Sequence, residues 1–177
     1  DRKRDGLVVR GQALGLSRVL FVPARVPSHR HHPHASAAHR FAMVALATQH
    51  DDGFGLSDIE MAHNEPAYTI DTVARLRADV RAATEFAFVT GADAFKDIRS
   101  WKAHTALLDQ CPFVVVSRPG LAATQMPDLL PELAARMHTP PFTLRQQPGI
   151  FLVDAPTAPV SSTEVRRAIE QGGDWQQ

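Results

Sequence analysis

Short apolar runs alternate along the chain with longer stretches in which apolar residues recur at helical spacing. The apolar runs predict strands at residues 18–23, 55–61, 85–91, 112–120 and 149–154, of which 55–61 is the weakest. The periodic stretches predict helices at residues 36–49, 68–80, 93–101, 104–110, 127–137 and 162–171. This order predicts an α/β protein built on a Rossmann-like parallel sheet with helices on both faces.

Polar segments follow four of the predicted strands. They read PARVPSHR, TGADAF, SRPG and APVSST. Ligands of open parallel sheets bind beyond the carboxyl ends of the strands. We therefore expect the functional residues in these four segments.

The segment VSSTEVRR allows two interpretations. Ser161 and Glu164 have the spacing of a capping box, which is a purely structural device. The same helix start offers free N–H groups, the hydroxyls of Ser162 and Thr163, and a guanidinium one turn on at Arg166. These groups are suited to binding a phosphate.

The segments TGADAF and SRPG also carry alternatives. Gly91 permits close approach of a ligand, and Asp93 either caps a helix or accepts hydrogen bonds from ligand hydroxyls. Trp101 belongs to the core or stacks on an aromatic ligand. Arg118 forms a salt bridge at the rim or neutralises an anion.

Residues 28–39 are rich in histidine. They have no ordered metal-ligand spacing and no carboxylate nearby, so we predict no metal site there. We instead expect a loop that contacts phosphate through His29 and Arg30.

Composition narrows the function classes. A chain of 177 residues suffices for one domain, and its formal net charge of zero gives no indication of a nucleic-acid partner. The single cysteine, Cys111, fits a reducing compartment, and no apolar run is long enough to span a membrane. We expect a cytoplasmic protein; an oligomer is compatible with the sequence.

Six segments occur together in the chain: FVPARVPSHR, ASAAHRFAMVALA, AYTIDTVARLR, FVTGADAFKDIRSW, FVVVSRPG and SSTEVRRAI. Because of these six segments, the chain resembles bacterial nicotinate-nucleotide adenylyltransferase over nearly its whole length. The resemblance implies a nucleotidyltransferase fold. It also implies transfer of AMP from ATP to nicotinate mononucleotide, giving deamido-NAD and pyrophosphate, with Mg²⁺.

The resemblance also implies roles for individual residues. His29, Arg30, Ser162, Thr163 and Arg166 would hold the phosphates of ATP, with Arg166 and His29 as the catalytic groups. The mononucleotide would be bound by Tyr68, Thr69, Gly91, Asp93, Trp101 and Arg118. Among these, Gly91 and Asp93 would face the ribose, and Arg118 would lie near the mononucleotide. Trp101 would stack on the nicotinate ring, which Tyr68 and Thr69 would border.

The chain departs from the family at its start. The family's first strand and its GGTFDPxHxGH turn, whose histidines bind ATP phosphates, have no counterpart here. We therefore expect residues 1–177 to form one nucleotidyltransferase domain that lacks the first strand and is truncated at both ends. The alternatives are a non-catalytic or degenerate nucleotide-binding domain, and a related adenylyltransferase with another acceptor such as phosphopantetheine.

Overall fold

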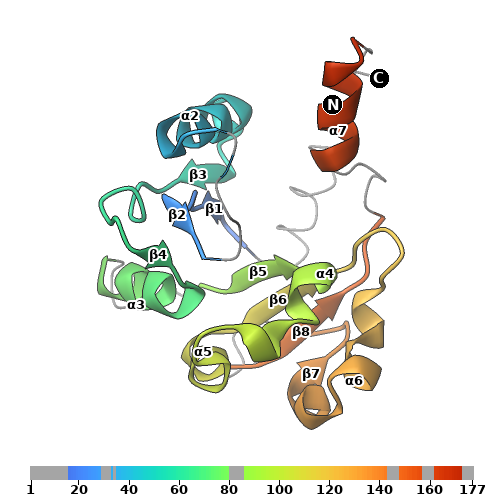
Figure 1. Ribbon diagram of the computed structural model, residues 1–177. Coiled ribbons are helices and arrows are strands. Elements are labelled where there is room, and N and C mark those ends of the chain that lie inside the picture. Colours follow the sequence, from blue (N-terminus) through green and yellow to red (C-terminus); the bar gives the residue numbers. More distant parts are fainter. Residues whose placement is uncertain are drawn as a thin grey trace.

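The computed structural model describes residues 16–28, 33, 35–79, 86–142, 148–156 and 162–172. The strands are β1 (Val19–Phe21), β2 (Val26–Pro27), β3 (Phe54–Leu56), β4 (Pro66–Ala67), β5 (Phe88–Gly91), β6 (Phe113–Val116), β7 (Met137–His138) and β8 (Ile150–Val153). The α-helices are α2 (Ala37–Thr48), α3 (Thr69–Asp79), α4 (Ala92–Phe95), α5 (His104–Gln110), α6 (Met126–Leu129) and α7 (Ser162–Glu170). The described residues also form three 3₁₀ helices: η1 (Ile98–Ser100), η2 (Ala123–Gln125) and η3 (Pro131–Arg136) (Figure 1).

Every named strand pair is parallel. The largest sheet has the order β5-β6-β8-β7, and its register places Gly91 beside Val116 and Val116 beside Val153. Two smaller sheets consist of β1 with β3 and of β2 with β4. Among the described residues, β1 pairs only with β3 and β5 only with β6. The predicted parallel α/β architecture is confirmed.

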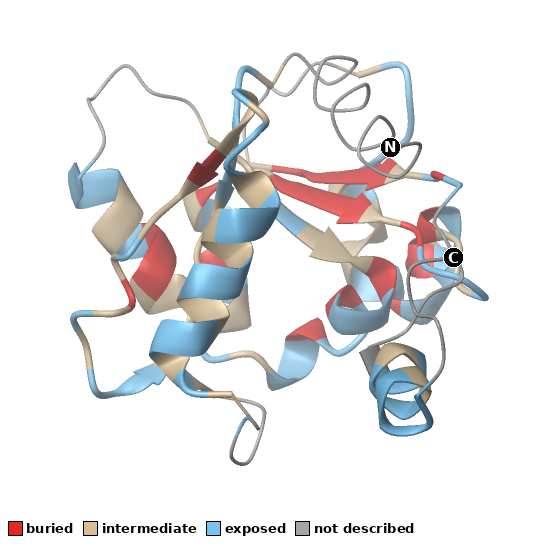
Figure 2. Cartoon of the chain, turned by 90° about the horizontal axis from the view of Figure 1, so that it is seen from above, coloured by how far each residue is buried: buried red, intermediate tan, exposed pale blue. Residues whose placement is uncertain are grey.

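The centre of the four-stranded sheet is buried on both faces. Along β6, Phe113 and Val115 belong to the main core cluster, whereas Val114 alternates to the opposite face. All three side chains have zero exposure, and the buried strands of the sheet are drawn in red in Figure 2. Burial on both faces explains why β6 and β8 are continuous apolar runs in the sequence.

Short helical segments pack on the cluster face of the sheet. Phe95 of α4, Ile98 of η1 and Leu107 of α5 are fully buried there, and the rings of Phe95 and Phe113 lie 6.0 Å apart. Val73 joins α3 to the same cluster. These helices therefore share one apolar core with β5 and β6 and cover one face of the sheet.

The prediction of one helix at residues 127–137 is wrong. The chain forms α6, then η3, and then the short strand β7. Pro131 explains the break, because it lacks a backbone N–H and disfavours helical geometry at the residue before it. Leu130 accordingly leaves the helix, with φ −133° and ψ 63°.

Other boundaries also moved. The strand predicted at 55–61 ends at Leu56, and the strand predicted at 112–120 covers only Phe113–Val116. Residues 93–101 form α4 and η1 instead of a single helix. Ser36 caps α2, since its hydroxyl accepts a hydrogen bond from the His39 N–H at 3.2 Å. No described helix is both long and apolar enough to cross a bilayer.

Candidate active site at the carboxyl ends of the strands

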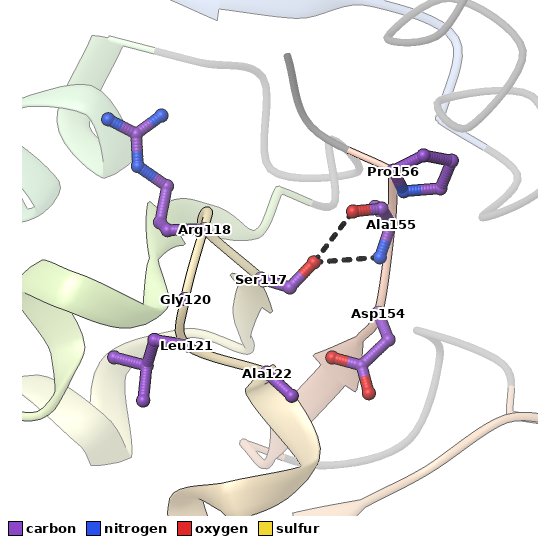
Figure 3. Close-up of a pocket in the computed structure, with 8 residues that line it drawn as sticks. All are labelled: Ser117, Arg118, Gly120, Leu121, Ala122, Asp154, Ala155 and Pro156. Carbon is purple, nitrogen blue, oxygen red and sulfur yellow. Dashed lines mark hydrogen bonds between the residues drawn. The ribbon is translucent and has the colours of Figure 1, made fainter. Parts of the chain in front are cut away.

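The carboxyl ends of β6 and β8 open into a pocket of about 530 Å³. It is lined by Ser117, Arg118, Gly120, Leu121, Ala122, Asp154, Ala155 and Pro156 (Figure 3). The pocket thus lies where parallel sheets bind ligands, at the segment SRPG and just before APVSST.

Ser117 fastens the two strand ends together. Its hydroxyl donates to the Ala155 carbonyl and accepts from the Ala155 N–H, both at 2.8 Å (Figure 3). The Ser117 N–H also donates to the Val153 carbonyl at 3.0 Å. These bonds hold the floor of the pocket in one geometry.

A tight turn presents Arg118. The backbone groups of Arg118 and Leu121 exchange two hydrogen bonds of 2.9 Å across Pro119 and Gly120. Gly120 has φ +79°, which an L side chain rarely adopts and which a proline–glycine turn requires. The Arg118 side chain extends from this turn away from Asp154 (Figure 3).

Gly91, Asp93 and Arg118 come together from neighbouring strands. The Asp93 carboxylate lies 3.4 Å from the Arg118 Nε, and about half of each side chain is exposed. A Cβ at Gly91 would overlap Asp93 Oδ1 and lie 3.1 Å from Arg118 Cδ, so a larger residue there would displace these two side chains from their present positions. Helix α4 has Gly91 at its N-cap position, and Asp93 does not cap it.

The ion pair between Asp93 and Arg118 leaves some of their hydrogen-bonding groups free to bind a ligand. The salt bridge predicted as one alternative for Arg118 is present, but it is long and half-exposed. A guanidinium has five N–H donors, so one carboxylate does not exhaust it. Asp93 and Arg118 therefore offer an acceptor and a cation together at the edge of the sheet.

A second group of predicted residues lies between α3 and the start of α5. Tyr68 precedes α3, and the Lys102 Nζ lies 4.7 Å from the centre of its ring. Lys102 also forms a 2.8 Å ion pair with Asp71 in the first turn of α3. Trp101, directly before Lys102, packs edge-to-face on Phe88 with ring centres 6.0 Å apart. Tyr68 and Trp101 are thus joined through Lys102.

The two groups are connected by β5. Trp101 touches Phe88 at the start of this strand, and Gly91 ends it. Three strand steps correspond to about 10 Å.

A buried carboxylate supports the first turns of α3. Glu60 is 2% exposed and accepts a 2.5 Å hydrogen bond from the Thr72 hydroxyl. Arg75 forms an ion pair with the same Glu60 oxygen at 3.1 Å. The Thr72 hydroxyl also lies 3.2 Å from the Tyr68 carbonyl, so Glu60 helps to fix the segment that carries Tyr68.

The middle of the segment PARVPSHR pairs with the two residues that precede Tyr68. Val26 and Pro27 of β2 pair with Pro66 and Ala67 of β4, a contact that the sequence did not predict. Arg40 donates to the carbonyls of Ala24 and Arg25 at 2.6 and 2.9 Å. The segment is thereby fixed between β4, which directly precedes Tyr68, and Arg40 of α2.

The predicted phosphate-binding residues are less completely described. Thr163 and Arg166 lie exposed on α7, which stands apart from the sheets in Figure 1. The structure does not bring them into contact with Asp93 or Arg118. His29, Arg30, Ser161 and the side chain of Ser162 lie outside what the structure describes, and their roles stay predictions.

The sequence did not single out Ser117, Asp154 or Lys102. Asp154 accepts 2.6 Å hydrogen bonds from the Ala123 N–H and the Thr124 hydroxyl, and so fixes η2 against β8. Its position directly after an apolar run was an available indication. Lys102 had no such indication, because its neighbours Tyr68 and Asp71 are distant in the sequence.

Two other chemistries find no support among the described residues. Burial raises the pKa of the Cys111 thiol to about 11, so it stays protonated and a poor nucleophile at neutral pH. In the part of the chain that the structure describes, no three histidine, cysteine or acidic side chains gather as metal ligands do.

Parallel strands with an open pocket at their carboxyl ends are the arrangement in which α/β sheets bind ligands. A family model described as cytidylyltransferase-like matches residues 10–168. The chain therefore belongs to the cytidylyltransferase-like family of nucleotidyltransferases.

Relatives narrow the similarity further. The chain is 36% identical to a protein of Pectobacterium atrosepticum, over 91% of this chain and 77% of that one. It is 34% identical to a Yersinia pestis protein and 36% identical to one from Serratia proteamaculans, covering 74% and 73% of those chains. All three are named "Probable nicotinate-nucleotide adenylyltransferase".

A solved structure confirms the fold. The nicotinic acid mononucleotide adenylyltransferase of Plasmodium falciparum, complexed with NaAD, superposes with a TM-score of 0.69. The match covers 95% of this chain and 78% of the other at 18% identity. This likeness confirms the predicted Rossmann-like nucleotidyltransferase fold.

Proposed function

We propose that this protein transfers the adenylyl group of ATP to nicotinate mononucleotide, giving deamido-NAD and pyrophosphate. The observation that carries the proposal is the Asp93–Arg118 pair, at the carboxyl ends of adjacent strands and beside an open pocket. The names of the relatives support this acceptor.

The reaction places few chemical demands on the protein. A phosphate oxygen of the mononucleotide attacks the α-phosphorus of ATP, a new P–O bond forms, and the bond to the bridging oxygen of pyrophosphate breaks. The attacking phosphate is already ionised, so no general base is required. Catalysis then depends on alignment and on neutralisation of charge.

The described residues suit this task. Arg118 supplies a fixed positive charge for the mononucleotide phosphate, and Asp93 accepts hydrogen bonds from ribose hydroxyls. Trp101 and Tyr68 offer aromatic faces for the nicotinate ring. Thr163 and Arg166, with Ser162, His29 and Arg30, are proposed to hold the phosphates of ATP.

Magnesium is proposed to accompany ATP. Among the described residues, no three histidine, cysteine or acidic side chains gather as metal ligands do. Mg²⁺ commonly binds through substrate phosphates and only one or two carboxylates. We therefore derive no step in which these residues hold the ion.

The test is a pyrophosphate-release assay with ATP, Mg²⁺ and nicotinate mononucleotide. Arg118→Ala is expected to lower kcat/KM by roughly 10²-fold, because a charge aimed at the reacting phosphates is lost. Arg99→Ala is the matched control, since Arg99 also pairs with a carboxylate but lies on η1 beside Glu132 of η3. It should leave kcat/KM unchanged.

A parallel sample carries the family's N-terminal GGTFDPxHxGH segment fused before residue 1. The proposal is supported if either sample releases pyrophosphate and if Arg118→Ala abolishes that release in the sample that shows it. If both proteins fold and neither releases pyrophosphate, the assignment fails. Nucleotide binding without turnover would then favour a non-catalytic domain. Turnover with phosphopantetheine in place of nicotinate mononucleotide would favour a related adenylyltransferase with another acceptor.

A further inference from the structure

Lys102 is a cation placed against the proposed ring-binding residues. Its Nζ lies 4.7 Å from the centre of the Tyr68 ring and 2.8 Å from Asp71 Oδ2. It directly follows Trp101 in the chain. The ammonium therefore lies against Tyr68, one of the residues that are proposed to border the nicotinate ring.

The backbone holds Lys102 in this position. Ala103, the next residue, adopts a left-handed conformation with φ 49° and ψ 44° at the start of α5. The Trp101 carbonyl accepts a hydrogen bond from the His104 N–H at 3.2 Å. Left-handed geometry at a non-glycine residue is costly, and such strain gathers at functional sites. The turn directs Lys102 to α3.

The hydrogen-bonding capacity of the ammonium is not exhausted by its carboxylate partner. Lys102 has three N–H donors, and Asp71 provides the one carboxylate that pairs with it among the described residues. About half of the Lys102 side chain is exposed, so a ligand is able to reach it. A ring carboxylate at this border would form a charge-assisted bond that a neutral carboxamide forms only weakly.

We propose that Lys102 makes this site prefer an acceptor mononucleotide whose pyridine ring carries a carboxylate over one whose ring carries a carboxamide. This inference rests on the proposed adenylyl transfer. Asp71 opposes the preference, because it neutralises part of the same ammonium. The two residues should therefore shift acceptor choice in opposite directions.

The test compares nicotinate and nicotinamide mononucleotides as acceptors. We measure kcat/KM for each with ATP and Mg²⁺, and the affinity for each without ATP by calorimetry, in the chain that supports turnover. Lys102→Met should lower the ratio of nicotinate to nicotinamide kcat/KM by roughly five- to tenfold. Asp71→Asn should raise it by roughly twofold.

Two further variants separate charge from structure. Lys102→Arg keeps the cation and should retain most of the preference. Lys96→Met removes an exposed lysine at the end of α4 that has no ion pair among the described residues, and it should leave the ratio unchanged. A merely structural role of Lys102 would weaken both acceptors equally and leave the ratio as it was.

The outcomes distinguish the two proposals. If the wild-type protein uses nicotinate mononucleotide and Lys102→Met keeps the wild-type ratio, this inference is overturned and the proposed function stands. If the wild-type protein uses neither acceptor, both are overturned. A fall in the ratio with Lys102→Met and a rise with Asp71→Asn supports the role of Lys102.

Discussion

The four-stranded sheet and residues 16–79 contain the same kinds of segment, yet they differ in how much apolar surface they bury. Six side chains of the neighbouring strands β6 and β8 have zero exposure: Phe113, Val114, Val115, Ile150, Phe151 and Leu152. In residues 16–79, Val73 is the one fully buried apolar side chain that the structure describes, and α2 buries none completely.

The comparison shows where this fold can place chemistry. Side chains at the ends of the buried strands, such as Arg118, have rigid supports and open surroundings. Tyr68 lies in the less buried region, where the Thr72 hydroxyl lies 3.2 Å from its carbonyl and the Lys102 ammonium lies over its ring. One half of the proposed site therefore depends on packing, and the other half depends on hydrogen bonds and ion pairs.

The largest expected effect tests the packing half. Phe113→Ala should lower the free energy of unfolding by about 3–5 kcal/mol, because a fully buried ring is removed from the core. Phe21→Ala in β1 should cost only about 1–2 kcal/mol, since Phe21 is partly exposed and packs edge-to-face on Phe54. Urea unfolding measures both, and equal losses would contradict the comparison.

The next effect tests the polar half. Glu60→Ala should cost about 2 kcal/mol, because Thr72 loses the carboxylate that accepts its hydroxyl and Arg75 loses its ion-pair partner. Glu65→Ala, at an exposed glutamate, should stay within about 0.5 kcal/mol of wild type. If a double-mutant cycle of Glu60→Ala with Thr72→Val shows no coupling, Glu60 does not act through Thr72.

Sequence reasoning succeeded where one segment carries its own pattern. The apolar runs of β6 and β8 and the periodicity of α3 identified those elements. The rule about strand ends directed attention to Gly91, Asp93 and Arg118, which the structure brings together and whose roles stay predictions. Sequence reasoning failed for β2 and β4, because a strand of two residues has no period to detect.

Contacts between distant segments were the other source of error. Nothing local in the sequence places Lys102 on Tyr68, or Glu60 under Thr72, because both contacts depend on how α3 packs. The exact pairing of Asp93 with Arg118 likewise follows from the register of β5 and β6. The sequence suggested which residues belong to the candidate site, but which of them contact each other is decided by the fold.

A smaller effect concerns the strained turn that carries Lys102. Ala103→Gly should stabilise the protein by about 0.5 kcal/mol, since relief of the left-handed conformation exceeds the added freedom of the unfolded chain. The same substitution at Ala42, exposed within α2, should destabilise by about 0.5–1 kcal/mol. Thermal unfolding of the two variants should therefore shift in opposite directions, and a loss with Ala103→Gly would argue against strain at this turn.

The smallest effect lies on the surface of the well-packed half. The Arg99 guanidinium donates two 2.7 Å hydrogen bonds to Glu132 and holds the pKa of that carboxyl below its usual value. A lowered native pKa means that the pair contributes stability above the unfolded pKa of Glu132 and loses it as pH falls through the native pKa. Glu132→Gln should therefore be slightly less stable than wild type at pH 7, and the two curves should converge in acid. Because the pair is exposed, added salt should shrink the difference at pH 7. A difference that persists at pH 2 would show that packing, and not the charge of Glu132, is responsible.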